Sequence, residues 1–247
     1  MKDKMFTYAE YLQILNLFRP HRIKSFKEAV GASEFVILRH DVEFSLNRAF
    51  KIAKIERSIG IKSTFFFQVL SNAYNPFSTQ NYKIIQKISQ MGHSVGLHAY
   101  ISHIETGDTY QLDKELVKQK TMFEHGLNLE CVNFSFHRPP KWVLEIRKDE
   151  ICDMVNAYGP SFFEFSSQPE NIIYLSDSKH NWSYGHPLAH THKDKMQILV
   201  HPDEWTEAGD SSLVEFFNGL KSEQKVDFEN TLNNENKNYA IAFGLDQ

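Results

Sequence analysis

The sequence has few cysteines, no long basic stretch and no long apolar run, and each absence excludes a class of protein. Cys131 and Cys152 are too far apart for a CxxC motif, so we expect two buried, reduced thiols. The 27 Lys and Arg residues stand against 31 Asp and Glu, a net charge of −4, and nucleic acid is therefore not an expected partner. No apolar run is long enough for a transmembrane segment.

The first residues, MKDKMFTYAEYLQILNLF, do not read as a secretory signal. Glu10, Gln13 and Asn16 interrupt the apolar positions, and no small-residue cleavage site follows. We therefore expect a cytoplasmic protein. The sequence contains no internal repeat and no low-complexity linker, and its composition of 41% hydrophobic and 23% charged residues is that of a globular chain. We expect one domain over residues 1–247.

Extended and helical patterns alternate along the chain. The spacing and the apolar runs predict strands at 34–38, 63–70, 94–97, 131–136, 171–175, 196–200 and 238–244. They predict helices at 7–18, 45–58, 79–91, 109–125 and 211–221. Strands that alternate with helices favour an α/β fold with parallel strands, arranged as a barrel.

Chemically active side chains follow five of the predicted strands. They are His40, Asp41 and Glu43; His98; His137 and Arg138; Asp177; and His201. In a parallel α/β barrel the positions after the strands share one face, and active sites are built there. Carboxylates and imidazoles that converge from separate strands suit a divalent metal of the zinc type.

Six segments in this order resemble a known family. They are RHDVEFS (39–45), GHSVGLHAY (92–100), SFHRPP (135–140), VNAYGPSFF (155–163), YLSDSKHNW (174–182) and ILVHPDEW (198–205). The chain resembles the polysaccharide deacetylases of NodB homology, carbohydrate esterase family 4. It is most similar to the divergent cytoplasmic branch from O-antigen and capsule gene clusters. The resemblance covers about residues 34–205 and implies a distorted (β/α) barrel of about seven parallel strands.

The resemblance also implies a role for each matching position. Asp41 matches the general base, Arg138 the residue that orients it, and His201 the general acid. Glu43 and His98 match two metal ligands. The implied activity is a metal-dependent hydrolase, zinc being the expected metal, that removes N-acetyl groups from a sugar or glycan precursor. The expected partner is an N-acetylated sugar, a nucleotide-sugar or a lipid-linked glycan.

Two positions depart from the family pattern. Glu43 stands where aspartate is usual. The second metal histidine normally lies four residues after the first, but that position is Ser102 and the next histidine is His103. On a helix the rings of His98 and His103 would point about 140° apart, so they share a metal only if the segment is a loop. We assign His103 as the third ligand and keep His40 and His137 as alternatives.

Three residues are assigned to the substrate, namely Asp177, Trp182 and His137. Trp182 is expected to form an apolar wall for the acetyl group, and the alternative is a half-buried packing residue. Two other functions stay open at this point. One is a non-catalytic carbohydrate-binding relative of the barrel, and the other is a C–N hydrolase that needs no metal.

Overall fold

The computed structural model describes residues 5–164, 171–236 and 238–243, and its centre is an eight-stranded sheet. In spatial order the strands are β5 (Glu150–Ile151), β6 (Met154–Asn156), β4 (Asn133–His137), β3 (Ser94–Tyr100), β2 (Thr64–Phe67), β1 (Phe35–Val42), β8 (Lys195–Val200) and β7 (Ile173–Ser176). Every neighbouring pair is parallel except β5 and β6. The expected α/β architecture with parallel strands is therefore confirmed. The curled sheet forms half a barrel and is not closed, since its edge strands β5 and β7 do not pair with each other.

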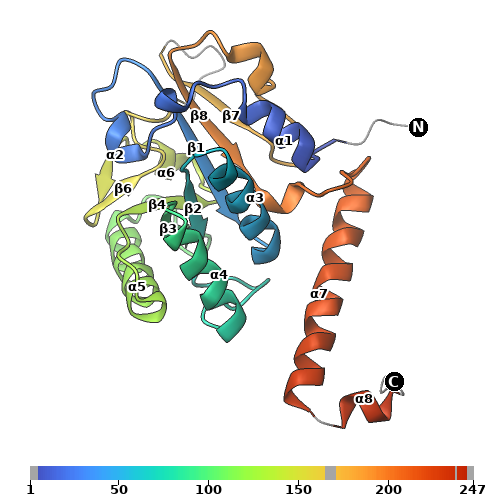
Figure 1. Cartoon of the computed structure of the whole chain (residues 1–247). Coiled ribbons are helices and arrows are strands. Elements are labelled where there is room, and N and C mark those ends of the chain that lie inside the picture. Colours follow the sequence, from blue (N-terminus) through green and yellow to red (C-terminus); the bar gives the residue numbers. More distant parts are fainter. Residues whose placement is uncertain (1–4, 165–170, 237, 244–247) are drawn as a thin grey trace.

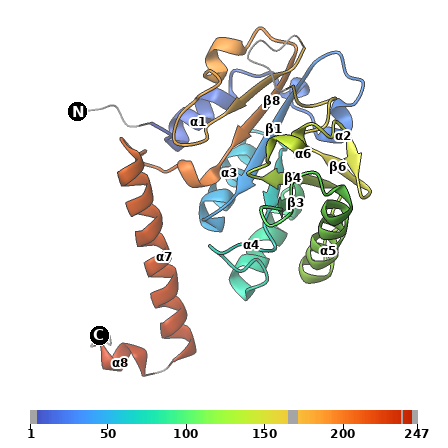
Figure 2. The same ribbon diagram turned by 180° about the vertical axis from the view of Figure 1, so that it is seen from behind.

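Helices cover the outer face of the sheet. The main ones are α1 (Tyr8–Leu15), α3 (Leu46–Ser58), α4 (Thr79–Gln90) and α5 (Thr109–Leu127). A further long helix is α7 (Leu213–Glu235). Shorter turns of helix are α2 (Phe26–Ala29), α6 (Lys141–Leu144), α8 (Tyr239–Ala242), η1 (Pro20–Arg22), η2 (Pro187–His190) and η3 (Pro202–Glu204). In Figure 1, α3, α4 and α5 lie side by side on the sheet, and Figure 2 shows the same from behind. Both views show α7 extending away from the sheet, with α8 at its far end.

Strand β1 is buried along its whole length because it lies between β2 and β8. Its side chains alternate between two environments, as the period of two residues in a strand requires. Phe35 and Ile37 belong to the apolar cluster inside the curled sheet, and the following positions of the same period are Arg39 and Asp41. The barrel interior therefore becomes polar towards the carboxyl end of β1.

The alternate positions of β1 face the helices. His40 is one of them, and its Nε2 atom lies 2.8 Å from Glu56 of α3. The Tyr11 hydroxyl of α1 donates to the same carboxylate at 2.6 Å. His40 thus ties the sheet to its helical layer, and it lies on the opposite side of β1 from Asp41.

Two segments differ from the sequence-based expectation. The strand predicted at 238–244 is wrong: residues Tyr239–Ala242 form the short helix α8, and Gly244 lies outside the described residues. A short apolar run has no period that separates a strand from a helical turn, so the local sequence did not decide between them.

The hairpin of β5 and β6 was not expected. Its turn residues, Cys152 and Asp153, both have left-handed backbone conformations, as a two-residue type I′ turn needs.

Candidate active site

A cavity of about 690 Å³ opens at the carboxyl ends of the strands. Five residues that the sequence placed after strands line it together, and they are Asp41, Glu43, His98, Arg138 and His201. The remaining wall is largely aromatic and apolar, and includes Phe44, Phe136, Tyr158, Tyr174 and Phe216. The cavity therefore combines a small set of titratable groups with an apolar lining, which is the usual composition of a small-molecule site.

Asp41 is held by Arg39, which lies two residues earlier on the same strand. Arg39 donates from Nε and Nη2 to the two oxygens of Asp41, at 2.9 and 2.7 Å. Burial alone would raise the pKa of Asp41, but the adjacent guanidinium holds it below its ordinary value. Arg39 is itself fixed by the Tyr158 hydroxyl at 2.9 Å and by Gln197 at 3.2 Å. The result is a buried, ionised carboxylate at the edge of the cavity.

Glu43, His98 and His137 bring three ligand atoms to one point. His137 Nδ1 lies 2.9 Å from Glu43 Oε1 and 3.3 Å from His98 Nε2, and His98 Nε2 lies 3.4 Å from Glu43 Oε1. The side-chain amide of Gln68 also lies 3.2 Å from His137 Nδ1. Among the described residues this is the group of three whose ligand atoms could hold a metal ion, all within 4.8 Å of one another.

A hydrogen bond at Nδ1 orients the ring of His98. Its Nδ1 atom lies 2.7 Å from the Ser135 hydroxyl, and that hydroxyl donates to Asp41 Oδ1 at 3.2 Å. Strand register produces this contact, because His98 on β3 is paired with Ser135 on β4. A hydrogen bond at Nδ1 leaves Nε2 directed at Glu43 and His137, which is the arrangement that metal-binding histidines generally have.

The cluster of Glu43, His98 and His137 fits a divalent metal by its donor set. Two imidazole nitrogens and one carboxylate oxygen suit zinc or a similar ion, and three protein ligands leave a coordination position open. Burial would raise the pKa of Glu43, but its hydrogen bonds with His137 and His98 hold the pKa well below the ordinary value. Glu43 is thus ionised, as a ligand has to be.

His201 lies across the cavity and is fixed by Asp177. Its Nδ1 atom is 2.7 Å from Asp177 Oδ1, and its backbone N–H donates to the same carboxylate at 3.0 Å. The indole N–H of Trp205 donates to Asp177 Oδ2 at 2.8 Å. Burial lowers the pKa of His201, but the hydrogen bond and charge of Asp177, with Glu43 and Asp41 nearby, raise it to about 10. His201 is therefore an imidazolium at neutral pH.

Asp203 sets the backbone of the loop that carries Glu43. Its carboxylate accepts the backbone N–H groups of Glu43 at 3.0 Å and Phe44 at 3.1 Å, and also that of Ser45. Ser45 is the N-cap of α3, so the same loop starts that helix. These hydrogen bonds join the loops after β1 and β8 at Glu43.

The remaining sequence-assigned residues are placed as follows. His103 is not brought to the cluster: its side chain is 48% exposed and lies 3.6 Å from Glu115 of α5. Asp177 is fully buried behind His201 and does not line the cavity. Trp182 is half-buried and packs edge-on against Trp205 and His186, also outside the cavity wall. His137, by contrast, lies within the cluster of Glu43 and His98.

Arg39 and Ser135 contact Asp41 and His98 but were not among the site residues predicted from the sequence. The pairing of Arg39 with Asp41 could have been predicted from the sequence. Residues two apart in a strand point to the same side, and a buried carboxylate needs a partner. The contact of Ser135 with His98 could not be predicted in this way, because it depends on the register between two strands separated by a helix. Arg138, expected to orient the base, is exposed in the cavity wall, and in the described part of the chain it makes no hydrogen bond or ion pair.

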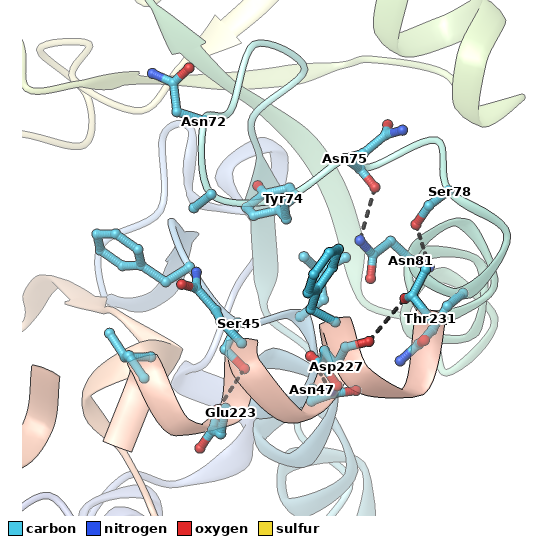
Figure 3. Close-up of a pocket in the computed structure, with 17 residues that line it drawn as sticks. Ser45, Asn47, Asn72, Tyr74, Asn75, Ser78, Asn81, Glu223, Asp227 and Thr231 are labelled. Atoms are coloured by element: carbon cyan, nitrogen blue, oxygen red, sulfur yellow. Dashed lines mark hydrogen bonds between the residues drawn. The ribbon is translucent and has the colours of Figure 1, made fainter. Parts of the chain in front are cut away.

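A second cavity, of about 550 Å³, lies between the loops after β1 and β2 and helix α7 (Figure 3). Its lining is mostly amides and hydroxyls, with Glu223 and Asp227 as the acidic groups. Glu223 is paired with Arg48 at 2.7 Å. Phe44 lines both cavities, so they are neighbours, but the titratable cluster belongs to the first.

No family model matches the sequence, and no curated protein matches it. Several solved structures are similar. One is a mutant of a CE4 family pseudoenzyme with restored enzymatic activity, at 17% identity and a TM-score of 0.47; the match covers 79% of this chain and 64% of that one, less than two thirds of its length. Another is a family 4 carbohydrate esterase from Bacillus anthracis, at 14% identity, 92% and 90% coverage and a TM-score of 0.44.

A third similar structure is the chitin deacetylase from Colletotrichum lindemuthianum. It is 14% identical, with 76% of this chain and 81% of that chain covered and a TM-score of 0.42. Similarities at this level do not assign a family or a function to the chain. In the described residues, no helix combines the length and apolarity of a membrane span.

Proposed function

We propose that this chain is a metal-dependent hydrolase that removes an N-acetyl group from a sugar or glycan precursor. The observation that carries the proposal is the content of one cavity. Its wall includes Glu43 and His98, which form a three-ligand cluster with His137, together with an ionised buried carboxylate (Asp41) and an imidazolium (His201). The motif resemblance of residues 34–205 to the CE4 deacetylases supports the same reaction.

Glu43, His98 and His137 would hold the metal, for which we propose zinc. When bound, such an ion supplies Lewis acidity towards the acetamide carbonyl and lowers the pKa of water at the site. This ligand set replaces the one expected from the sequence, with His137 in the place of His103. The substitution of Glu for Asp at position 43 is accommodated because the longer side chain reaches His137 as well as His98.

Asp41 is the proposed general base. It receives the proton of the attacking water, and Arg39 keeps its carboxylate oriented and ionised between turnovers. The same guanidinium makes Asp41 a weak base, so the transfer depends on an acidified water. The hydrogen bond from Ser135 couples Asp41 to the ring of His98, which keeps base and ligand in one arrangement.

His201 is the proposed general acid. Asp177 occupies its Nδ1 side, which leaves the Nε2–H for the leaving nitrogen. With a pKa of about 10 the ring is protonated at neutral pH and can protonate the departing amine. Asp177 thus acts through His201, and we propose it as a positioning residue rather than a contact to the sugar.

The proposed setting is the cytoplasm. Both cysteines are free thiols, Cys131 buried and Cys152 half-buried, and free thiols are usual in a reducing compartment. The proposed substrates are accordingly precursors made inside the cell, namely an N-acetylated sugar, a nucleotide-sugar or a lipid-linked glycan.

The test is acetate release by the zinc-loaded chain from a panel of N-acetylated sugars and glycan fragments, compared with Asp41→Asn. We expect the variant to lose at least about 10²-fold in rate, the usual contribution of a general base. Asp113→Asn, which removes an exposed carboxylate on α5, is the matched control and should keep the wild-type rate. A wild-type rate in Asp41→Asn would refute the assignment. A zinc-loaded chain that binds these sugars but releases no acetate would favour the non-catalytic alternative.

A further inference from the structure

The carboxylates that line the catalytic cavity all have partners. Asp41 is paired with Arg39, and Glu43 with the two histidines of the cluster. Asp203 accepts three backbone N–H groups, and Glu204 lies 2.7 Å from His180 Nδ1. Each of these carboxylates is therefore already hydrogen-bonded within the protein.

Two cations in the same wall have no such partner. Arg138 and Lys179 both line the cavity and are exposed, and in the part of the chain that the structure describes neither makes a hydrogen bond or an ion pair. An exposed cation next to ionised carboxylates usually pairs with one of them. Here the carboxylates are occupied, so the two positive charges are available to a ligand.

Both cations lie on constrained segments. Arg138 has a φ of +48°, and two prolines, Pro139 and Pro140, follow it. Lys179 has a φ of +63°, and the next residue, His180, is fixed between Glu204 and the backbone carbonyl of Asp210. A left-handed backbone is unfavourable for residues with a side chain, so packing must hold both segments in place.

We propose that Arg138 and Lys179 bind an oxyanion carried by the substrate, such as a phosphate ester on the N-acetylated sugar. The inference rests on the proposed function, since it assumes that the sugar occupies this cavity. A guanidinium can bind two phosphate oxygens at once, and an ammonium adds a point charge. The cations come from the loops after β4 and β7, and both line the cavity that Asp41 and His201 also line.

The neighbouring cavity of Figure 3 does not compete for this role. Its lining contains no lysine, arginine or histidine, and it includes the carboxylates of Glu223 and Asp227. An anionic group placed there would meet two carboxylates and no cationic side chain of the lining. The structure thus assigns the charged part of the substrate to the cavity that Glu43 and His98 line.

The experiment measures binding rather than hydrolysis, using the full chain with zinc added. The probes are N-acetylglucosamine, N-acetylglucosamine 1-phosphate, N-acetylmuramic acid and inorganic phosphate, each titrated by calorimetry. The variants are Arg138→Gln, Lys179→Gln and the double variant. The control is Arg19→Gln with Lys114→Gln, which removes the same charge from exposed positions outside the cavity. Zinc coordination by phosphate is common to all variants, so differences between them report on the two cations.

We expect the phosphorylated sugar and inorganic phosphate to lose about tenfold or more in affinity for each cation removed, as for charge-assisted hydrogen bonds. The neutral sugar and the control variant should show no change. N-acetylmuramic acid separates a carboxylate from a phosphate ester: a parallel loss extends the site to carboxylates, and no loss restricts it to phosphate. Anion affinities that are equal in wild type and double variant, or no anion-dependent binding at all, would overturn the proposal. Neither result depends on acetate release, which tests the hydrolase separately.

Discussion

The two histidines His137 and His103 give the sharpest test of the metal site, because the structure and the sequence pattern assign the third ligand differently. His137 Nδ1 lies 2.9 Å from Glu43 Oε1 and 3.3 Å from His98 Nε2, whereas His103 is 48% exposed beside Glu115. We predict that His137→Ala weakens zinc binding strongly and that His103→Ala leaves it unchanged.

The expected loss of zinc affinity follows from the group that each substitution removes. Loss of a group that merely orients a metal ligand typically costs about 10–100-fold in metal affinity. His137→Ala removes one of three ligands itself, so we expect at least the upper end of that range, about 100-fold or roughly 2.7 kcal/mol. His103→Ala removes a solvent-exposed ring with one contact at 3.6 Å, and the zinc affinity should stay within about twofold.

The assay is a competition titration of zinc between the protein and a chromophoric chelator, for wild type, each single variant and the double variant. Circular dichroism and urea unfolding establish that His137→Ala still folds, since that ring also stacks on Tyr100 at 5.4 Å. The double variant should bind zinc like His137→Ala alone. A loss of affinity in His103→Ala that equals or exceeds the loss in His137→Ala would refute the assignment.

Three further predictions concern the residues around the cluster. Ser135→Ala should lower zinc affinity about 10–100-fold in the same competition assay, because it removes the hydrogen bond that orients the adjacent ligand histidine. Arg39→Met should lower the free energy of unfolding by about 3–5 kcal/mol in urea titrations, because Asp41 becomes a buried charge without its partner; a change below 1 kcal/mol would contradict the pairing. The folded-state pKa of His201 is raised from 6.5 to about 10, so the stability from its pair with Asp177 is complete below pH 6.5 and is lost as the pH rises through about 10. Wild type should therefore lose more stability than Asp177→Asn between pH 7 and 10, and equal losses would argue against the raised pKa.

The convergence of Asp41, His98 and His201 on one cavity was accessible from the sequence. Each follows or ends an apolar run, and the carboxyl ends of parallel strands meet at one edge of the sheet. The side of β1 on which Arg39 and Asp41 lie was also accessible, since it depends only on the alternation within one strand. Local patterns alone therefore predict that the proposed base and the proposed acid lie near each other.

The third proposed ligand, His137, was not accessible in the same way. His98 lies inside β3, which continues to Tyr100, and the chain then turns away and takes His103 to the side of α5. His137 reaches the cluster because Tyr100 pairs with it across β3 and β4. That pairing is a matter of register between strands separated by a long helix, and no nearby residue encodes it. The sequence spacing therefore favoured His103 as the third ligand. In the structure, the pairing of β3 with β4 brings His137 to Glu43 and His98 instead.

The contact between Asp203 and the loop of residues 43–45 has a consequence for the newly synthesised chain. Asp203 follows Glu43 by 160 positions, so the loop that carries this ligand leaves the ribosome long before its acceptor has been made. Contacts of such separation form late, after the intervening chain has closed. The geometry around Glu43 is thus completed only when β8 has docked beside β1 and η3 has brought Asp203 beneath the loop. A metal bound at the proposed cluster would add its free energy to chains that have reached this stage.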